Sequence, residues 1–482
     1  MNQGIVIGGG IAGLVSAIRL ALDGNAVTLL EKQDQLGGQI RRIEEGKHVF
    51  EIGATPISMP WVIEQVFHDA GQRLTETLDF VPLSVNSRHF FHNSQVIDLT
   101  ANPDHMAYQL KYFSLEDRLG FIDYLNRLQS IYKGVEAYWL NNPLFSWQDL
   151  LSLKGMKAWL SFHPFQSMDR LHRYFFDDPR LIGMMNRYAD YMNASPFKMP
   201  ALGAMIGYLE LTQGTYQVRG GMWQLIVALE KLAQQVGVTI HKACQVDEIL
   251  VKDERVVGVR SSEQKWEADF VVSNVDTLTA QATLLKRKHL LTDEEKLSSS
   301  KFICLLGIKK EYDHLIHHNV FYPEQIGREF VDIFERGEWP LTPAIDVQTL
   351  NGNSLCITVP VPARGFQDQR IPDYKQYKAQ LVYQLETEWQ LEGLANQIET
   401  ELMFGPKELE SWTGSYRGAL SGMAYHGIKA FFSPSLRDQK LEGLYYTGGT
   451  TRPGSTTTLS VISGIHVSDM IGFDLSQKVV QA

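Results

Sequence analysis

Cysteine and basic charge are scarce in this chain of 482 residues. Its three cysteines, Cys244, Cys304 and Cys356, lie far apart, with no CxxC pair and no even-numbered set that would suggest a disulfide framework. We therefore expect free thiols that pack as small apolar side chains in a reducing compartment. Asp and Glu outnumber Lys and Arg by 55 to 45, and the net charge of −10 argues against nucleic acid as a partner, because phosphate binding favours a basic face.

Long uncharged runs are missing as well. Residues 1–18 carry no charge, but five glycines interrupt them, the first three residues (MNQ) include no basic side chain, and Arg19 and Asp23 follow. These features fit neither a signal peptide nor a membrane-spanning helix, so we expect a soluble, cytoplasmic protein. The motifs GxSxG, HExxH and the P-loop do not occur either, and no local motif identifies a catalytic residue.

The N-terminal segment does contain a nucleotide-binding pattern. Apolar residues 5–7 predict a buried strand, Gly8, Gly10 and Gly13 form a GxGxxG turn, and an amphipathic helix and a second strand lead to Glu31. The glycines allow a tight turn, close approach of a pyrophosphate to the backbone, and close packing of helix on strand. The helix N-terminus offers N–H groups to the phosphates. Glu31 follows Gly10 by about 20 residues, where an acid accepts hydrogen bonds from an adenosine ribose and would repel the extra phosphate of NADP.

A pair of glycines after this unit favours FAD over NAD as the cofactor. Gly37 and Gly38 are followed by Arg41 and Arg42. The extended motif resembles the FAD-binding motif of the flavin amine oxidase and phytoene desaturase superfamily. That family usually has an arginine directly after the second glycine, whereas this chain has Gln39, so the resemblance leaves open which arginine reaches the cofactor.

Residues 215–276 resemble the second part of the same FAD domain. Gly220-Gly221-Met222 precede an amphipathic helix, and the resemblance implies that the backbone at Val246 lies near the adenine. Turn residues and β-branched side chains predict four strands, at 238–241, 245–252, 256–260 and 270–273.

A third part lies near the C-terminus, where 448–464 read GGTTRPGSTTTLSVISG. A strand at 443–447 delivers Gly448 and Gly449 to its carboxyl end, and residues 455–458 offer N-caps to an apolar helix. The stretch resembles the C-terminal loop of bacterial carotenoid desaturases. A helix N-terminus at a flavin would stabilise negative charge on the reduced ring, and the glycines would let backbone lie against its face.

These three parts predict an α/β fold: a discontinuous Rossmann-like FAD-binding domain (1–76, 215–276 and 431–482), a mixed-sheet substrate domain and a helical subdomain (77–214 and 277–430). No metal site is expected. We interpret His314, His317 and His318, which would share one helical face, as a solvated cluster. By the resemblance, the FAD-binding residues are Gly8, Gly10, Ile11, Ala12, Gly13, Glu31, Lys32, Gly37, Gly38, Arg41, Val246, Gly448, Gly449, Thr458 and Leu459.

The central region, including Ser195-Pro196 and Tyr208-Leu209-Glu210, resembles the phytoene/diapophytoene desaturase family. The resemblance implies an FAD-dependent oxidoreductase that desaturates a hydrophobic isoprenoid, such as phytoene or diapophytoene, held in an apolar tunnel. The alternatives are terminal oxidation or isomerisation of a carotenoid, another reaction of the flavin amine oxidase superfamily, or a non-catalytic flavin- or lipid-binding protein. The sequence does not identify the electron acceptor.

The resemblance also implies contact with a membrane surface, on the inner face of the cell membrane. Basic and aromatic residues around Lys154, Lys157, Trp159 and Phe162 are the candidates for this contact. The alternative is that the aromatic side chains of this region pack inward in a helical core.

Overall fold

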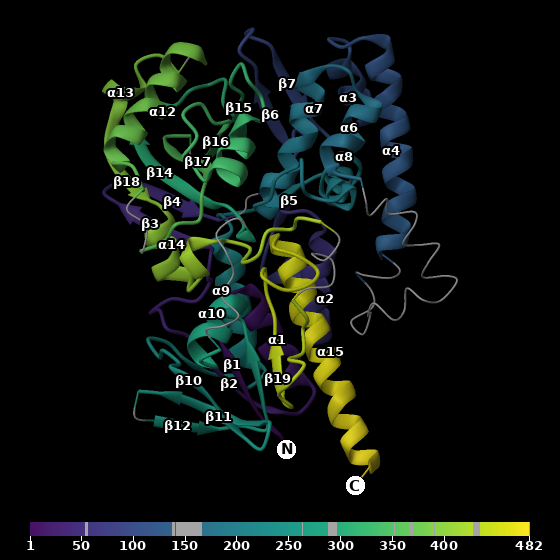
Figure 1. Cartoon of the computed structure of the whole chain (residues 1–482), viewed down its shortest axis with the longest axis vertical. Helices are drawn as coiled ribbons and strands as arrows, with labels where there is room; N and C mark the ends of the chain where they lie inside the picture. The colour runs from purple at the N-terminus through teal and green to yellow at the C-terminus, as the bar shows by residue number, and fades with distance from the viewer. Residues whose placement is uncertain are drawn as a thin grey trace.

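The computed structural model shows an elongated molecule with the parallel sheet at one end, near both termini, and a larger antiparallel sheet and a group of helices at the other (Figure 1). Residues 154, 157, 159 and 162, expected at a membrane, lie outside the described part of the chain. The described residues are 1–53, 56–136, 140, 166–262, 264–287, 296–350, 352–366, 370–389, 391–427 and 434–481.

The parallel sheet has five strands from three distant stretches of the chain. Their order is β19 (Leu444–Tyr446), β13 (Phe270–Ser273), β1 (Gln3–Ile7), β2 (Ala26–Leu30) and β9 (Thr239–His241), and every neighbouring pair is parallel. The strands are apolar because both faces of the sheet are buried. The prediction of a Rossmann-like sheet is confirmed.

Helices cover one face of this sheet and a small antiparallel sheet covers the other. Side chains such as Val6, Leu29 and Val272 pack against the helices, whereas Ile5, Leu30 and their neighbours pack against the small sheet. The helices are α1 (Ile11–Leu22), α2 (Pro60–Asp69), α9 (Trp223–Gln235) and α15 (Thr457–Gln481); the small sheet is β10 (Glu248–Lys252), β11 (Arg255–Ser261) and β12 (Gln264–Glu267).

The second large sheet has seven strands and is mixed. All neighbouring pairs are antiparallel except β15 and β6. One face is apolar and packs on α12 (Tyr374–Glu388). The strand order is β18 (Ile398–Phe404), β14 (Ser300–Ile308), β17 (Ser354–Val361), β16 (Ile345–Thr349), β15 (His318–Phe321), β6 (Ser87–Phe90) and β7 (Val96–Leu99).

A helical group beside this sheet has its own apolar core. It contains α3 (Pro103–Leu110), α4 (Leu115–Val135), α6 (Met168–Phe175), α7 (Pro179–Asn186) and α8 (Met205–Gln213). Shorter elements connect the parts: strand pairs β3 (Arg41–Glu45) with β4 (His48–Ile52) and β5 (Phe80–Pro82) with β8 (Tyr216–Val218), and helices α10 (Thr277–Thr279), α11 (Arg328–Val331), α13 (Leu394–Gln397) and α14 (Pro406–Thr413).

The histidine cluster is the expectation that the structure overturns. The segment is not helical: His314 and His317 are half-buried before β15, and His318 begins that strand with only 2% of its surface exposed. Strand pairing therefore prevails over the helical spacing of the three rings. Among the described residues no group of His, Cys, Asp and Glu has the arrangement of a metal site.

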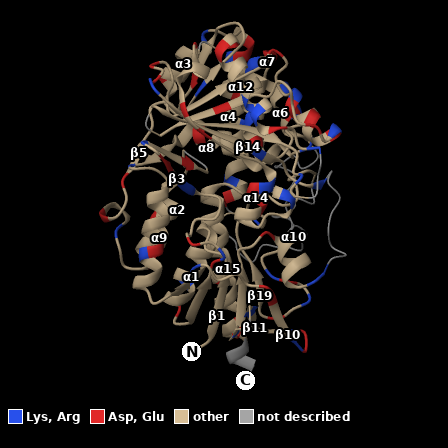
Figure 2. Cartoon of the chain, turned by 90° about the vertical axis from the view of Figure 1, so that its left-hand side faces the viewer, with Lys and Arg blue, Asp and Glu red and all other residues tan. Residues whose placement is uncertain are grey.

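The surface carries both signs of charge. In the side view of Figure 2, Lys and Arg are interspersed with Asp and Glu along the outer elements. None of the helices in the described ranges combines the length and apolar character needed to cross a bilayer. The three cysteines are free: Cys304 and Cys356 are buried and Cys244 is half-buried, as expected for packed thiols.

Candidate functional site

A cavity of about 340 Å³ lies at the carboxyl ends of β1 and β2, and we call it the dinucleotide cavity. It is the place where open parallel sheets bind ligands. The structure brings residues of the first two predicted segments together here, with Trp412 from a third stretch. The predicted residues that line it are Gly8, Gly10, Glu31, Lys32, Gly38, Arg41 and Val246.

The glycine turn is shaped so that only glycine fits. Gly8 has a φ of +97°, and a Cβ on Gly13 would lie 2.1 Å from the Gly8 carbonyl oxygen. A Cβ on Gly10, which caps α1, would lie 2.8 Å from the side-chain nitrogen of Asn274. Gly37 donates its N–H to the Gly9 carbonyl at 2.9 Å, which ties the second glycine pair to the first turn. The result is a cradle of bare backbone at a helix N-terminus, which suits an anionic group.

Glu31 is held in one position on the cavity wall. One carboxylate oxygen accepts the Gly9 N–H at 2.6 Å and the other accepts the Gln33 N–H at 2.8 Å. Lys32 beside it donates to the Ser411 carbonyl at 2.7 Å, and burial lowers the pKa of its ammonium. A fixed carboxylate with free lone pairs can accept hydrogen bonds from ribose hydroxyls.

The structure distinguishes the two arginines. The Arg41 guanidinium lies 4.7 Å from the ring centroid of Trp412 and lines the dinucleotide cavity, and burial lowers its pKa. Arg42 pairs instead with Glu44 at 2.9 Å and does not line the cavity. Of the two, Arg41 is therefore placed to reach a bound dinucleotide.

The remaining predicted residues lie around the cavity rather than in its wall. Ile11 and Ala12 begin α1 and are buried, and Ala12 packs against Gly464 of α15. Gly448 follows β19, has a φ of +104° and donates its N–H to the Ser463 hydroxyl at 3.0 Å. Gly449 comes next, where its carbonyl accepts from the Tyr425 hydroxyl at 3.4 Å.

A second cavity, of about 200 Å³, lies between the two halves of the molecule, and we call it the polar chamber. Gly38 lines the dinucleotide cavity and Gln39 lines the chamber, so the two spaces adjoin at this turn. The start of α15, including Thr458, forms part of its wall, and Thr456 caps that helix by accepting the Leu459 N–H at 3.3 Å. A ligand bound along the glycine turn can thus extend to the N-terminus of α15.

The seven-stranded sheet closes the chamber with its polar face. Cross-strand register places Ile303 opposite Thr358, Thr358 opposite Asp346, and Gln348 opposite His318. Successive strand residues point to opposite faces, so these side chains share one face while the apolar core lies behind them. The sheet residues that line the chamber are Lys301, Ile303, His318, Asp346, Gln348, Cys356 and Thr358.

Five charged side chains meet at this wall, four of them buried and Lys301 half-buried, and we call them the ion cluster: Arg187, Asp190, Lys301, His318 and Asp346. Asp190 Oδ2 accepts from the Lys301 ammonium and lies 3.1 Å from Arg187 Nη1. Asp346 Oδ2 accepts from His318 Nε2 at 2.7 Å and lies 3.5 Å from Arg187 Nη2. Burial opposes charge on both partners, but their attraction raises the pKa of His318 and holds the pKa of Asp346 below its usual range.

The ion cluster was not anticipated from the sequence. Its members come from the short 3-10 helix Arg187–Met192 after α7 and from three strands, and they meet only through the sheet register and the packing of that helix on the sheet. The alternation in Ile345–Thr349, with Asp346 and Gln348 facing one way, is the signal that could have indicated a polar strand face.

An apolar cavity of about 80 Å³ adjoins the polar chamber. Ser58, Ile206, Thr456 and Thr458 line both spaces. The rest of its wall is almost entirely apolar and includes Met192, Met199, Leu202, Met205, Leu209 and the predicted Leu459. The two spaces together suit a ligand with an apolar segment in the cavity and a polar end in the chamber.

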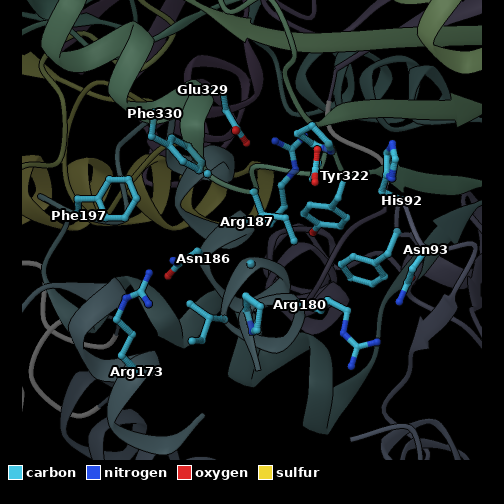
Figure 3. Close-up of a pocket in the computed structure, with 18 residues that line it drawn as sticks. His92, Asn93, Arg173, Arg180, Asn186, Arg187, Phe197, Tyr322, Glu329 and Phe330 are labelled. Carbon is cyan, nitrogen blue, oxygen red and sulfur yellow. The ribbon is translucent and has the colours of Figure 1, made fainter. Parts of the chain in front are cut away.

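A further pocket of about 380 Å³ lies on the other side of Arg187, which projects among its lining residues in Figure 3. Arg173 and Arg180 at its rim already pair with Asp169 at 2.8 Å and with Asp178 at 2.9 Å. This outer pocket shares no lining residue with the dinucleotide cavity. The polar chamber, next to that cavity, is therefore the better candidate for the active site.

Comparisons with known proteins agree with this arrangement. The family of flavin containing amine oxidoreductases matches residues 11–471. The chain is 29% identical to 4,4'-diapolycopene oxygenase of Methylomonas sp, with 98% of each chain covered, and 28% identical to 4,4'-diaponeurosporene oxygenase of Staphylococcus aureus, with 97% of each covered. These relatives are carotenoid-pathway enzymes.

Solved structures show the same fold at low identity. Cyclohexylamine oxidase from Brevibacterium oxydans has a TM-score of 0.64 at 13% identity, covering 98% of this chain and 99% of that chain. A putrescine oxidase bound to putrescine has a TM-score of 0.65 at 13% identity, with the same coverage.

Proposed function

Because the chain belongs to the family of flavin containing amine oxidoreductases and is an FAD-dependent oxidoreductase, we propose that it oxidises a long linear polyene of the carotenoid class. The observation that carries this proposal is the apolar cavity that opens into the polar chamber beside the dinucleotide cavity. Removing apolar surface of a substrate from water favours its binding against such walls.

The three predicted segments would hold the FAD. We assign the pyrophosphate to the turn from Gly8 to Gly13, the ribose to Glu31, the adenine to the backbone at Val246, and the flavin to the loop from Gly448 to Leu459. The glycine cradle and the contact between the two cavities at Gly38 support this assignment. Bound FAD supplies a two-electron acceptor for oxidation of a substrate C–H bond.

We give oxygenation of the polyene as the first candidate reaction. It is supported by two relatives, named as oxygenases of diapolycopene and diaponeurosporene, that match almost the whole chain. Desaturation of a phytoene- or diapophytoene-like precursor is the second candidate. It is supported by Leu209 and Glu210, part of the desaturase-like central motif, which line the apolar cavity and the polar chamber.

Pigment analysis in cells that make linear carotenoids tests the proposal and separates the two reactions. Expression in cells that make a coloured diapocarotenoid should yield a product with an added oxygen, detected by chromatography and mass spectrometry. If the second reaction is correct, cells that make only colourless phytoene or diapophytoene should gain colour, because each new double bond lengthens the conjugated system.

The matched inactive variant is Gly449→Asp. A Cβ at this position would lie 3.2 Å from the Ser455 Cα, so an aspartate places bulk and charge in the loop assigned to the flavin, and it should abolish either product. No change in any linear polyene, from a protein that contains FAD, would contradict the proposal. Turnover of another reductant with an artificial electron acceptor would then separate a different oxidase from a non-catalytic binding protein.

A further inference from the structure

The wall of the polar chamber has two buried polar atoms without a partner in the described part of the chain. They are Nδ1 of His318 and Oδ1 of Asp190, in residues that are only 2% and 3% exposed. Buried polar groups are nearly always hydrogen-bonded, because leaving one unpaired costs free energy. Two such atoms in the lining of one chamber indicate that a ligand with a polar group completes their hydrogen bonds.

The neighbouring contacts determine whether each of the two atoms donates or accepts a hydrogen bond. Asp346 is an acceptor, so the His318 Nε2 that faces it at 2.7 Å carries a hydrogen. Burial lowers the pKa of His318, but the attraction of Asp346 outweighs it and raises that pKa, which favours the doubly protonated ring in which Nδ1 is also a donor. Asp190 uses Oδ2 for Lys301 and Arg187, and its Oδ1 stays an acceptor.

A hydrocarbon cannot satisfy either atom, whereas an oxygen at a chain end can. A carbonyl oxygen accepts one hydrogen bond, and a hydroxyl both accepts and donates. The adjoining apolar cavity offers apolar contacts to the part of such a ligand next to its polar end, since both spaces share Ser58, Ile206 and Thr458.

We propose that the polar chamber is a binding site for the oxygen-bearing end of a polyene, in which the oxygen accepts a hydrogen bond from His318 Nδ1 and a hydroxyl donates to Asp190 Oδ1. This rests on the proposed function and deepens it, because it adds polyene alcohols and aldehydes to the ligands of the enzyme. His318 is then a specificity-determining residue, and Asp346 and Arg187 position it.

Binding to the FAD-containing protein tests the proposal without any need for turnover. A linear polyene aldehyde and the hydrocarbon of the same chain length are titrated separately into the protein in detergent at neutral pH. The aldehyde should bind about tenfold more tightly, the effect of one added charge-assisted hydrogen bond. Its absorption maximum should also move to longer wavelength, since a cationic donor at the oxygen polarises the conjugated chain.

Two replacements of His318 separate the roles of its nitrogens. His318→Gln places an amide nitrogen near the position of Nε2, keeps the contact with Asp346 and lacks the donor at Nδ1, so the preference for the aldehyde should disappear. His318→Asn places its amide near Nδ1 and should keep part of that preference. His317→Gln is the control: its ring faces the Asn86 carbonyl at 3.0 Å, outside the chamber, and both affinities should stay unchanged.

Equal affinity for aldehyde and hydrocarbon in the wild-type protein would overturn the proposal, whatever the variants do. A preference that survives in FAD-containing His318→Gln would also overturn it. Turnover of a hydrocarbon polyene without selective binding refutes this inference alone. Selective binding without turnover supports the inference and refutes the proposed function.

Discussion

At the scale of single residues, burial sets the protonation of the polar groups around the chamber. Glu210 on α8 lines the chamber and is 5% exposed, and burial raises its pKa from 4.5 to about 7. The folded pKa therefore lies above the unfolded one. The contribution of Glu210 to stability is fully present below pH 4.5 and is lost as the pH rises through about 7.

Replacing Glu210 with Gln removes the titrating carboxyl group and nearly keeps the shape of the side chain. Between about pH 5 and about pH 8, the free energy of unfolding of the wild type should fall relative to that of Glu210→Gln by about 1–3 kcal/mol. Urea denaturation at several pH values measures the difference. Glu44→Gln, a change at an exposed side chain on β3, is the control and should follow the wild type. Parallel pH profiles for wild type and Glu210→Gln would contradict the prediction.

At the scale of elements, α4 has two apolar faces. Ser114 caps the helix by accepting the Asp117 N–H at 3.0 Å, and Phe121, Tyr124 and Leu128 are buried in the helical core. The other side exposes a row of large apolar side chains, Leu115, Leu119 and Ile122, each by more than half. Exposed apolar rows on a helix favour contact with a lipid interface.

We predict that the protein floats with liposomes and that Leu119→Ser with Ile122→Ser weakens flotation several-fold, because two apolar side chains leave the contact surface. FAD content should stay unchanged. Leu341→Ser is a matched control, since Leu341 is 70% exposed but lies next to α12, on the other side of the molecule in Figure 1. A wild-type protein that does not float, or equal loss in the control, would show that this face does not bind membranes. The earlier prediction for Trp159 and Phe162 remains untested.

At the scale of the whole molecule, the dinucleotide cavity joins distant parts of the chain. Its wall includes Gly10, Val246, Asn274 and Trp412, which belong to four separate stretches. A ligand that binds only the folded state stabilises that state, so FAD should hold these stretches together and raise the melting temperature.

Gly10→Val tests this coupling. A Cβ at Gly10 would lie 2.8 Å from the Asn274 side chain and would fill the pyrophosphate cradle, so the variant should lose at least about nine-tenths of its FAD and melt several degrees lower. FAD released on denaturation and the melting temperature are the measurements. Gly472→Ala, whose added methyl group meets nothing within 4 Å, should retain both. An unchanged FAD content in Gly10→Val would show that the cofactor does not bind at this turn.

The sequence by itself determined the parts of the fold that depend on neighbours along the chain. The strand, glycine turn, helix and acid of residues 1–31 each have a local signature, and the structure places β1, α1, β2 and Glu31 accordingly. The hydroxyl run before Leu459 likewise contains the residue that caps α15, Thr456. Short-range sterics and hydrogen bonds suffice for these features, so their spacing indicates them directly.

Only the tertiary structure determined which residues form the polar chamber and how its charged side chains pair. His314, His317 and His318 have helical spacing, yet β15 begins at His318 because it pairs with β16 and β6. Lys301, His318 and Asp346 reach one wall through the register of β14, β17, β16 and β15, which no short segment encodes. The same holds for Arg41, whose contact with Trp412 depends on where α14 packs, whereas Arg42 pairs with Glu44 two residues along β3. Register and packing are collective properties of many long-range contacts, so a local pattern cannot reveal them.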